Sequence, residues 1–298
     1  MGMAVLSSPA RTRLAACLVA MVVVLAGCAP AVPQPSGGPL TAVPVMNTYL
    51  MTVGQSGTIR HALGGVDGHM YLDSIDGLKQ DYGREYRLFE ADVNFTSDGV
   101  LVLAHGWTES DHVKRLGMPY DPADPVPTYE TFMGSKIQGR YTATSFRDLA
   151  GFMRTHTDMF VLLDFADRSY QDTVTAYSEV VREAGRDDSV LQRFIVGGHT
   201  TDMIDAVKTT WHFTLYNLYL DVPQNRTGIL KNLDDYIGYC RNNDISSFST
   251  AVDTFTPQVA AKMRTSGLVS YVFTTNDKKE ADSLRDLGAT IIGTDFLP

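Results

Sequence analysis

Two carboxylates lie one residue apart in an otherwise apolar stretch of the sequence. Glu90 and Asp92 occur in "YRLFEADVNF", and His105 follows after a turn at Asp98 and Gly99. Successive side chains of a β-strand point to opposite faces, so Glu90 and Asp92 must share one face. A buried unpaired charge is costly, and two adjacent carboxylates also repel each other. A divalent metal ion is the commonest partner for such a pair, and we predict one here.

The elements that position these residues follow from the periodicity of the chain. Apolar, β-prone runs alternate with amphipathic helical runs from about Thr58 to the end. Eight such strands with intervening helices in roughly 240 residues are typical of a closed barrel. An open doubly wound sheet is the alternative, but no glycine-rich phosphate loop has the required spacing. We therefore predict an α/β fold, a (β/α)8 TIM barrel with a small insertion after the second strand. The expected strands are "TIRHA", "YRLFEADV", "FVLLDF", "RFIVGG", "FTLYNLYL", "ISSFST", "LVSYVFTT" and "TIIGTDF".

In such a barrel the polar residues at the carboxyl ends of the strands meet at one rim, where TIM-barrel enzymes have their chemistry. Each residue alone has an ordinary structural explanation, such as a buried histidine or an aspartate that caps a helix. Their coincidence at one rim favours a functional site. The residues concerned are His61, Glu90, Asp92, Asp164 and Asp295, with His105 from the insertion.

These motifs resemble those of the glycerophosphodiester phosphodiesterases, within the wider group of phosphatidylinositol-phospholipase-like barrels. The matching stretches are "HALGG", "FEADVNFTSDG", "AHGW", "LLDF" and "GTDFLP", between Ile59 and Pro298. The resemblance implies that Glu90, Asp92 and Asp164 bind the metal and that His61 and His105 form an acid–base pair. Oxygen ligands suit Ca²⁺ or Mg²⁺. The implied substrate is a small phosphodiester.

Several positions depart from the family pattern. Ala62 replaces an arginine, Ala166 replaces a lysine, Gly106 replaces an aspartate, and Asp73 replaces an asparagine. Three carboxylates, one divalent ion and one phosphodiester leave a net charge of about −2, which the missing cations would have offset.

Two further residues are candidates for substrate binding. Arg168 follows Asp164 by four residues, so we hypothesise that it compensates for the missing cations at the rim. Trp107 is a candidate for the pocket wall, with core packing as the alternative.

Three functions agree with these residues. The first is hydrolysis of a glycerophosphodiester to an alcohol and glycerol phosphate, with histidine acid–base catalysis. The second is phospholipase C- or D-like action on intact phospholipid. The third is a catalytically weakened, membrane-tethered binding lipoprotein. The formal net charge of −9 and the lack of a basic stripe exclude nucleic acid as the main partner.

The N-terminal sequence predicts that the protein is exported from the cytoplasm. Arg11 and Arg13 precede a short apolar stretch, and "LAGC" resembles the bacterial lipoprotein processing box. We expect a signal peptide over 1–27, lipid on Cys28, an extended proline-rich tether over 28–54, and the phosphodiesterase barrel over 55–298. The expected location is the bacterial cell envelope, outside the cytoplasm, with the membrane as a partner through the lipid. An ordinary signal peptide or an uncleaved anchor are the alternatives.

Overall fold

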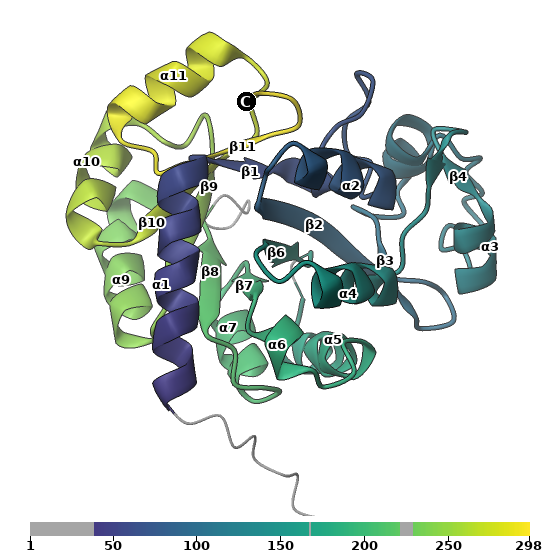
Figure 1. The fold of residues 1–298 in the computed structure, drawn as a ribbon, viewed down its shortest axis with the longest axis horizontal. Coiled ribbons are helices and arrows are strands. Elements are labelled where there is room, and N and C mark those ends of the chain that lie inside the picture. The colour runs from purple at the N-terminus through teal and green to yellow at the C-terminus, as the bar shows by residue number, and fades with distance from the viewer. Residues whose placement is uncertain (1–38, 167, 221–228) are drawn as a thin grey trace, which may run out of the picture. The chain divides into compact units, whose positions relative to one another are not determined.

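Eight parallel strands close into a barrel in the computed structural model of the chain, as predicted (Figure 1). The strands follow one another around the barrel in chain order, and β1 pairs with both β2 and β11, which closes the ring. All eight expected strands are present. They are β1 (Thr58–Arg60), β2 (Leu88–Phe95), β6 (Phe160–Asp164), β7 (Phe194–Gly198), β8 (Leu215–Tyr219), β9 (Ser247–Ala251), β10 (Val269–Phe273) and β11 (Ile291–Thr294).

The structure describes residues 39–166, 168–220 and 229–298. These described residues belong to one compact unit. The expected signal peptide and Cys28 lie outside the described residues, so they remain predictions.

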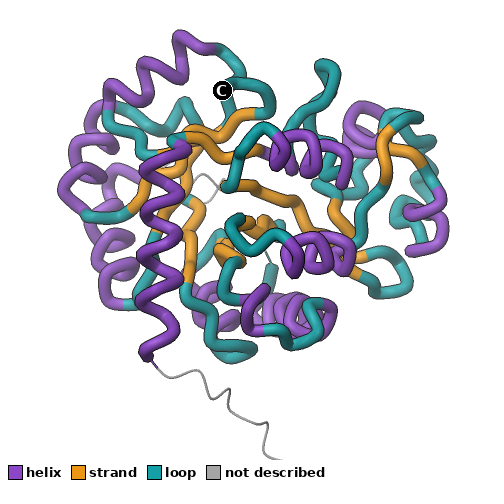
Figure 2. Tube along the Cα trace, viewed as in Figure 1, coloured by secondary structure: helices purple, strands orange, loops and turns teal. Residues whose placement is uncertain are grey.

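Helices surround the strands, as Figure 2 shows for the described part of the chain. Their starts agree with local sequence signals: Ser145 forms a capping box with Asp148, and Thr256 caps a helix that begins at Pro257. These helices are α2 (Ile75–Gly83), α4 (Phe146–Thr155), α5 (Tyr170–Glu183), α6 (Asp188–Leu191), α7 (Thr201–Lys208), α9 (Ile229–Asn242), α10 (Pro257–Ser266) and α11 (Lys278–Leu287).

The two faces of each strand have different neighbours. On β2, Phe89 and Ala91 pack in the cluster between barrel and helices, whereas Leu88 packs in the barrel interior. Residues two and four positions after Leu88 therefore also point inward, and these are Glu90 and Asp92. The alternation places both carboxylates inside the barrel near its carboxyl end.

The predicted insertion after β2 forms a small subdomain with its own core. It contains β3 (Leu101–Leu103), η2 (Asp111–Leu116), α3 (Tyr129–Gly134), β4 (Lys136–Ile137) and β5 (Tyr141–Thr142). Phe132, Ile137 and Leu116 are buried in its apolar cluster. This core gives the loops around His105 a fixed support.

The prediction of an extended tether is wrong for residues 39–54. The chain forms a helix, α1 (Pro39–Ser56), and Tyr49 and Val53 pack at the amino ends of the strands, where Tyr49 meets the Phe160 ring edge-on at 5.6 Å. The apolar side chains of Val45, Met46, Tyr49 and Val53 recur at helical spacing, and their burial outweighs the proline-rich composition that suggested an extended chain. In Figure 1, α1 crosses the barrel in front of β8–β10.

No helix within residues 39–166, 168–220 and 229–298 has the length and apolar character needed to cross a bilayer.

Candidate active site

Glu90, Asp92 and Asp164 converge at the carboxyl end of the barrel, and we call these three residues the acid cluster. Each offers an oxygen, and these oxygens lie within 4.8 Å of one another. Parallel pairing sets the convergence, because Asp92 of β2 is the direct partner of Asp164 of β6. The predicted metal ligands are therefore brought together.

Burial and mutual repulsion oppose ionisation in the acid cluster. Glu90 is only 2% exposed, and burial followed by the charges of Asp92 and Asp164 raises its pKa well above the ordinary range. Burial also raises the pKa of Asp92, against the opposing effect of His105 and His61. A positive ligand would relieve both effects.

The acid cluster fits a divalent cation. All three donors are carboxylates, which Ca²⁺ and Mg²⁺ prefer. The Oδ2 atom of Asp92 is buried and makes no hydrogen bond with any described residue. A buried acceptor without a partner costs about 1–3 kcal/mol, which a metal would offset.

His61 is held by a buried carboxylate from the other end of the chain. Its Nδ1 lies 3.0 Å from Oδ1 of Asp295, which is fully buried. Asn276 fixes this aspartate, because its Nδ2 donates to Oδ2 (2.8 Å) and its Oδ1 accepts from the Asp295 backbone N–H (2.9 Å). The aspartate sets the ring orientation and places the hydrogen on Nδ1, which leaves Nε2 available for proton transfer.

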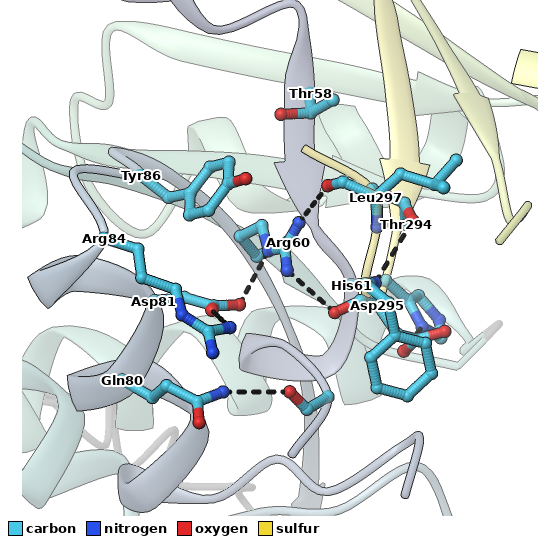
Figure 3. Close-up of polar contacts among 12 residues, drawn as sticks. Thr58, Arg60, His61, Gln80, Asp81, Arg84, Tyr86, Thr294, Asp295 and Leu297 are labelled. Atoms are coloured by element: carbon cyan, nitrogen blue, oxygen red, sulfur yellow. Dashed lines mark hydrogen bonds and ion pairs between the residues drawn. The ribbon is translucent and has the colours of Figure 1, made fainter. Parts of the chain in front are cut away.

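A buried arginine holds the segment that carries Asp295. Arg60 pairs with Asp81 of α2 at 2.7 Å and donates to the backbone carbonyl of Asp295 at 2.9 Å (Figure 3). It also donates to the carbonyl of Leu297 at 2.5 Å. Gly64 is required beside this pair, because its φ is 93° and a Cβ there would lie 2.2 Å from Asp81 Oδ2. Arg60 therefore fixes the chain terminus behind His61.

His105 has its own supporting carboxylate, which the sequence analysis did not identify. Its Nδ1 lies 3.1 Å from Oδ1 of Asp111, and the other oxygen of Asp111 accepts from the backbone N–H (3.0 Å) and hydroxyl (2.6 Å) of Thr108. Burial raises the pKa of Asp111, but the hydrogen bonds of Thr108 and the nearby His105 and Arg115 outweigh it, so the pKa is lowered overall. Asp111 is thus a stable anion behind His105.

Asp111 also explains the departure at position 106. A Cβ on Gly106 would lie 2.7 Å from Oδ2 of Asp111, so the carboxylate occupies the space beside His105 that a side chain at 106 would need. The carboxylate beside His105 therefore comes from η2 and not from position 106.

One aromatic ring lies between the two histidines. The ring of Tyr71 is 4.5 Å from that of His61 and 5.7 Å from that of His105, edge-on to each. Tyr71 lies in the loop between β1 and α2, where Ala62, Leu63 and Asp73 also have positive φ angles. Such backbone is strained for residues other than glycine and concentrates at functional sites. One result is that the Ala62 N–H reaches Oε2 of Glu90, at 2.8 Å.

Asp73 adds a fourth carboxyl beside the acid cluster. Its Oδ1 accepts from the backbone N–H of Asp92 (3.1 Å), and its Oδ2 is buried without a hydrogen-bond partner in the described chain. Burial and the charge of Asp92 raise the pKa of Asp73 well above the ordinary range. A carboxyl that keeps its proton offers a donor and an acceptor, as the amide of an asparagine does.

His199 is a third histidine at the site, and sequence reasoning missed it. It follows β7, and its Nε2 lies 2.8 Å from Oδ1 of Asp164, while its ring stacks on Tyr219 at 4.5 Å. The signal was present in the sequence, because Ile195 points into the barrel and His199 lies four residues later on the same face. His199 orients the carboxylate of Asp164.

The structure does not bring Arg168 to the acid cluster. Its guanidinium lies over the rings of Phe165 (5.2 Å) and Phe95 (5.7 Å), its Nε is buried without a partner among the described residues, and burial lowers its pKa. The hydrogen bond that the structure gives to the Asp164 carboxylate comes from His199. The geometry thus gives no support to the compensating role expected for Arg168.

Trp107 belongs to the core of the insertion. Its Nε1 donates to the carbonyl of Phe95 at 2.8 Å, and its ring meets that of Phe132 edge-on at 5.5 Å. Both its polar atom and its ring therefore have structural partners. Trp107 packs in a core, which was the alternative to a place in the pocket wall.

Several solved phosphodiesterase structures have a fold similar to that of this chain. A putative glycerophosphoryl diester phosphodiesterase from Silicibacter pomeroyi matches with a TM-score of 0.67 at 15% identity, over 84% of this chain and 94% of that one. A phosphodiesterase from Oleispira antarctica, in complex with the product sn-glycerol-3-phosphate, matches with a TM-score of 0.60 at 14% identity, over 80% and 92%. The glycerophosphodiester phosphodiesterase of Thermotoga maritima matches with a TM-score of 0.59 at 14% identity, over 80% and 94%.

This chain shares the fold of those phosphodiesterases. No family model matches its sequence, and no curated protein matches it. The identities are low, so the shared fold confirms the architecture that the motifs predicted, while the activity depends on the site itself.

Proposed function

We propose that the protein is a metal-dependent phosphodiester hydrolase that cleaves a glycerophosphodiester to an alcohol and glycerol phosphate. One observation carries this proposal: the acid cluster lies at the same barrel end as two imidazoles, each backed by a buried aspartate. A binding protein would have no need for two histidines held ready for proton transfer.

Glu90, Asp92 and Asp164 would hold the divalent cation, for which we propose Ca²⁺ or Mg²⁺. When bound, the cation supplies positive charge that offsets the carboxylates and polarises the phosphoryl oxygens. His199 keeps Asp164 oriented for this role through its hydrogen bond of 2.8 Å.

The two histidines move the protons. Nδ1 of each ring is engaged by an aspartate, and Nε2 of each makes no hydrogen bond with any residue that the structure describes. As a hydroxyl attacks phosphorus, one Nε2 accepts its proton. As the bond from phosphorus to the leaving oxygen breaks, the other Nε2 donates a proton to that oxygen. The attacking hydroxyl is water or a neighbouring hydroxyl of the substrate. Such transfer contributes roughly 10²–10⁴-fold to the rate.

The test is an assay of the purified protein against a panel of phosphodiesters, with Ca²⁺, with Mg²⁺ and with a chelator. We expect release of glycerol phosphate that depends on the metal and falls by roughly 10²–10⁴-fold in His61→Gln. His212→Gln, which changes an exposed histidine of the α7–β8 connection, is the matched control. Release of diacylglycerol or phosphatidic acid from intact phospholipid would indicate the phospholipase alternative. Binding of glycerophosphodiesters without turnover would indicate the binding-lipoprotein alternative.

We also propose that the protein is exported and anchored to the cell envelope by lipid on Cys28. The support is the sequence "LAGC" after a short apolar stretch with two arginines before it. Cys28→Ala should move the protein from the membrane fraction to the soluble fraction. An unchanged distribution would contradict the anchor.

A further inference from the structure

The site has few obvious cations for an anionic substrate. Positions 62 and 166 are alanines, Ala62 is fully buried, and the guanidinium of Arg168 lies over aromatic rings. With three carboxylates and a divalent ion, a phosphodiester would still meet net negative charge. Another cation is needed at the barrel mouth.

Arg115 lies at the mouth, between the catalytic candidates. It comes from η2 of the insertion and pairs with Asp111, and the same nitrogen, Nη1, contacts Nδ1 of His105. Its guanidinium carbon lies 4.2 Å from the centre of the Tyr71 ring, and the other edge-on neighbour of that ring is His61. The charge of Arg115 is therefore located over the ring that separates the two imidazoles.

Arg115 and the acid cluster act electrostatically on the same side chain, Tyr71. Burial raises the pKa of Tyr71, and the largest opposing influence is Arg115. The charges of Asp92, Asp295 and Glu90 act on the same tyrosine from the other side and raise its pKa. An anion at the acid cluster would lie within the same field.

Arg115 also has free donors. A guanidinium has five N–H groups in a planar fork, and both polar contacts of Arg115 are made by Nη1. Nε and Nη2 make no hydrogen bond with any residue in the described ranges, and the side chain is 26% exposed. Two N–H groups on one planar edge match the oxygens of a phosphoryl group.

We propose that Arg115 binds a phosphoryl oxygen of the substrate and supplies the charge that positions 62 and 166 lack. This role deepens the proposed function and rests on it. The insertion then contributes three parts of the site: His105, its supporting Asp111 and the phosphate-binding arginine.

Phosphate binding is measured by calorimetry, separately from turnover. The probes are inorganic phosphate and sn-glycerol 3-phosphate, each with the protein in Mg²⁺ and in Ca²⁺. Arg115→Met, which keeps the bulk of the side chain, should weaken both affinities by about 10- to 100-fold, the range for a lost charge-assisted hydrogen bond. Arg115→Lys should recover part of the loss, because a lysine keeps the charge without the fork. Arg285→Met removes an arginine of α11 that is paired with Asp282, and it should change neither affinity.

A positioning role for Arg115 predicts a different result. If Arg115→Met instead lowers kcat and leaves both affinities unchanged, Arg115 acts only on His105 and the inference is overturned. A wild-type protein that binds neither probe would overturn it as well. If the protein binds phosphate through Arg115 but hydrolyses no diester, the role of Arg115 is supported and the proposed activity is contradicted.

Discussion

Removing one charge from the acid cluster should stabilise the metal-free protein. At the 4.8 Å that bounds the separation of the ligand oxygens, two unit charges repel by about 3.5 kcal/mol in an effective dielectric of about 20. Each carboxylate faces two others, so full ionisation at this separation would cost each of them about 7 kcal/mol. Proton uptake relieves part of this repulsion, because burial and the neighbouring carboxylates raise the pKa of Glu90, and burial raises that of Asp92.

Asp92→Asn removes one charge with little change in volume. In a chelator at about pH 8, we expect a gain of about 1–3 kcal/mol in the free energy of unfolding, or roughly 2–10 °C in Tm. The same variant should lose most of the rise in Tm that Ca²⁺ or Mg²⁺ gives the wild type. That rise corresponds to about 2.7 kcal/mol at a metal concentration of 100 times Kd.

Scanning calorimetry with chelator and with each metal measures both effects. Asp286→Asn, which removes an exposed charge on α11, is the matched control and should leave Tm and the metal response unchanged. A lower Tm for Asp92→Asn without metal, or an undiminished metal response, would refute the assignment of the acid cluster as a cation site.

Four further predictions follow from the same geometry. His105→Gln should lower kcat by roughly 10²–10⁴-fold and keep the metal-induced rise in Tm, and loss of the metal response would indicate a structural role. Asp111→Asn should lower kcat by roughly 10–100-fold, measured in the diester assay, because His105 loses the partner that orients it; an unchanged kcat would exclude that role. Without metal, the stability contributed by the acid cluster should fall as the pH rises from about 4, because the folded state holds protons that the unfolded chain releases. The fall should end once the pH exceeds the raised pKa values of the folded state. The stability advantage of Asp92→Asn should therefore grow between about pH 5 and pH 8, and an advantage that shrinks would contradict the raised pKa of the acid cluster. Tyr49→Ala should cost about 3–5 kcal/mol in urea unfolding, because Tyr49 is 1% exposed against the barrel, whereas a mere tether would tolerate the change.

Substitutions in this site are balanced by residues from other elements. Gly106 lacks the family's aspartate, but Asp111 takes the space and binds the same ring. Ala166 lacks the family's lysine, yet His199 contacts Asp164 from the next strand of the barrel. At both positions the contact to the site residue comes from a residue outside the matching motif.

The sequence by itself determined the barrel and most of the residues of the candidate site. Alternation with period two is a local property, so the inward direction of Glu90, Asp92 and Asp164 follows once the strands are recognised. The same rule places His199 inside the barrel, but its contact with Asp164 depends on the pairing of β7 with β6. The carboxyl ends of parallel strands must meet at one rim, which is why residues far apart in the chain could be assembled correctly.

Only the tertiary structure decided which groups support the two histidines and where the cations lie. Asp111 and Arg115 reach His105 from an irregular insertion, where no period relates sequence distance to direction. The path of residues 39–56 was decided in the same way, because an uncharged, proline-containing segment becomes a helix only when Tyr49 and Val53 can bury against the barrel. Local patterns fix faces and ends of regular elements, whereas contacts between loops depend on packing energies that arise only after the barrel has closed.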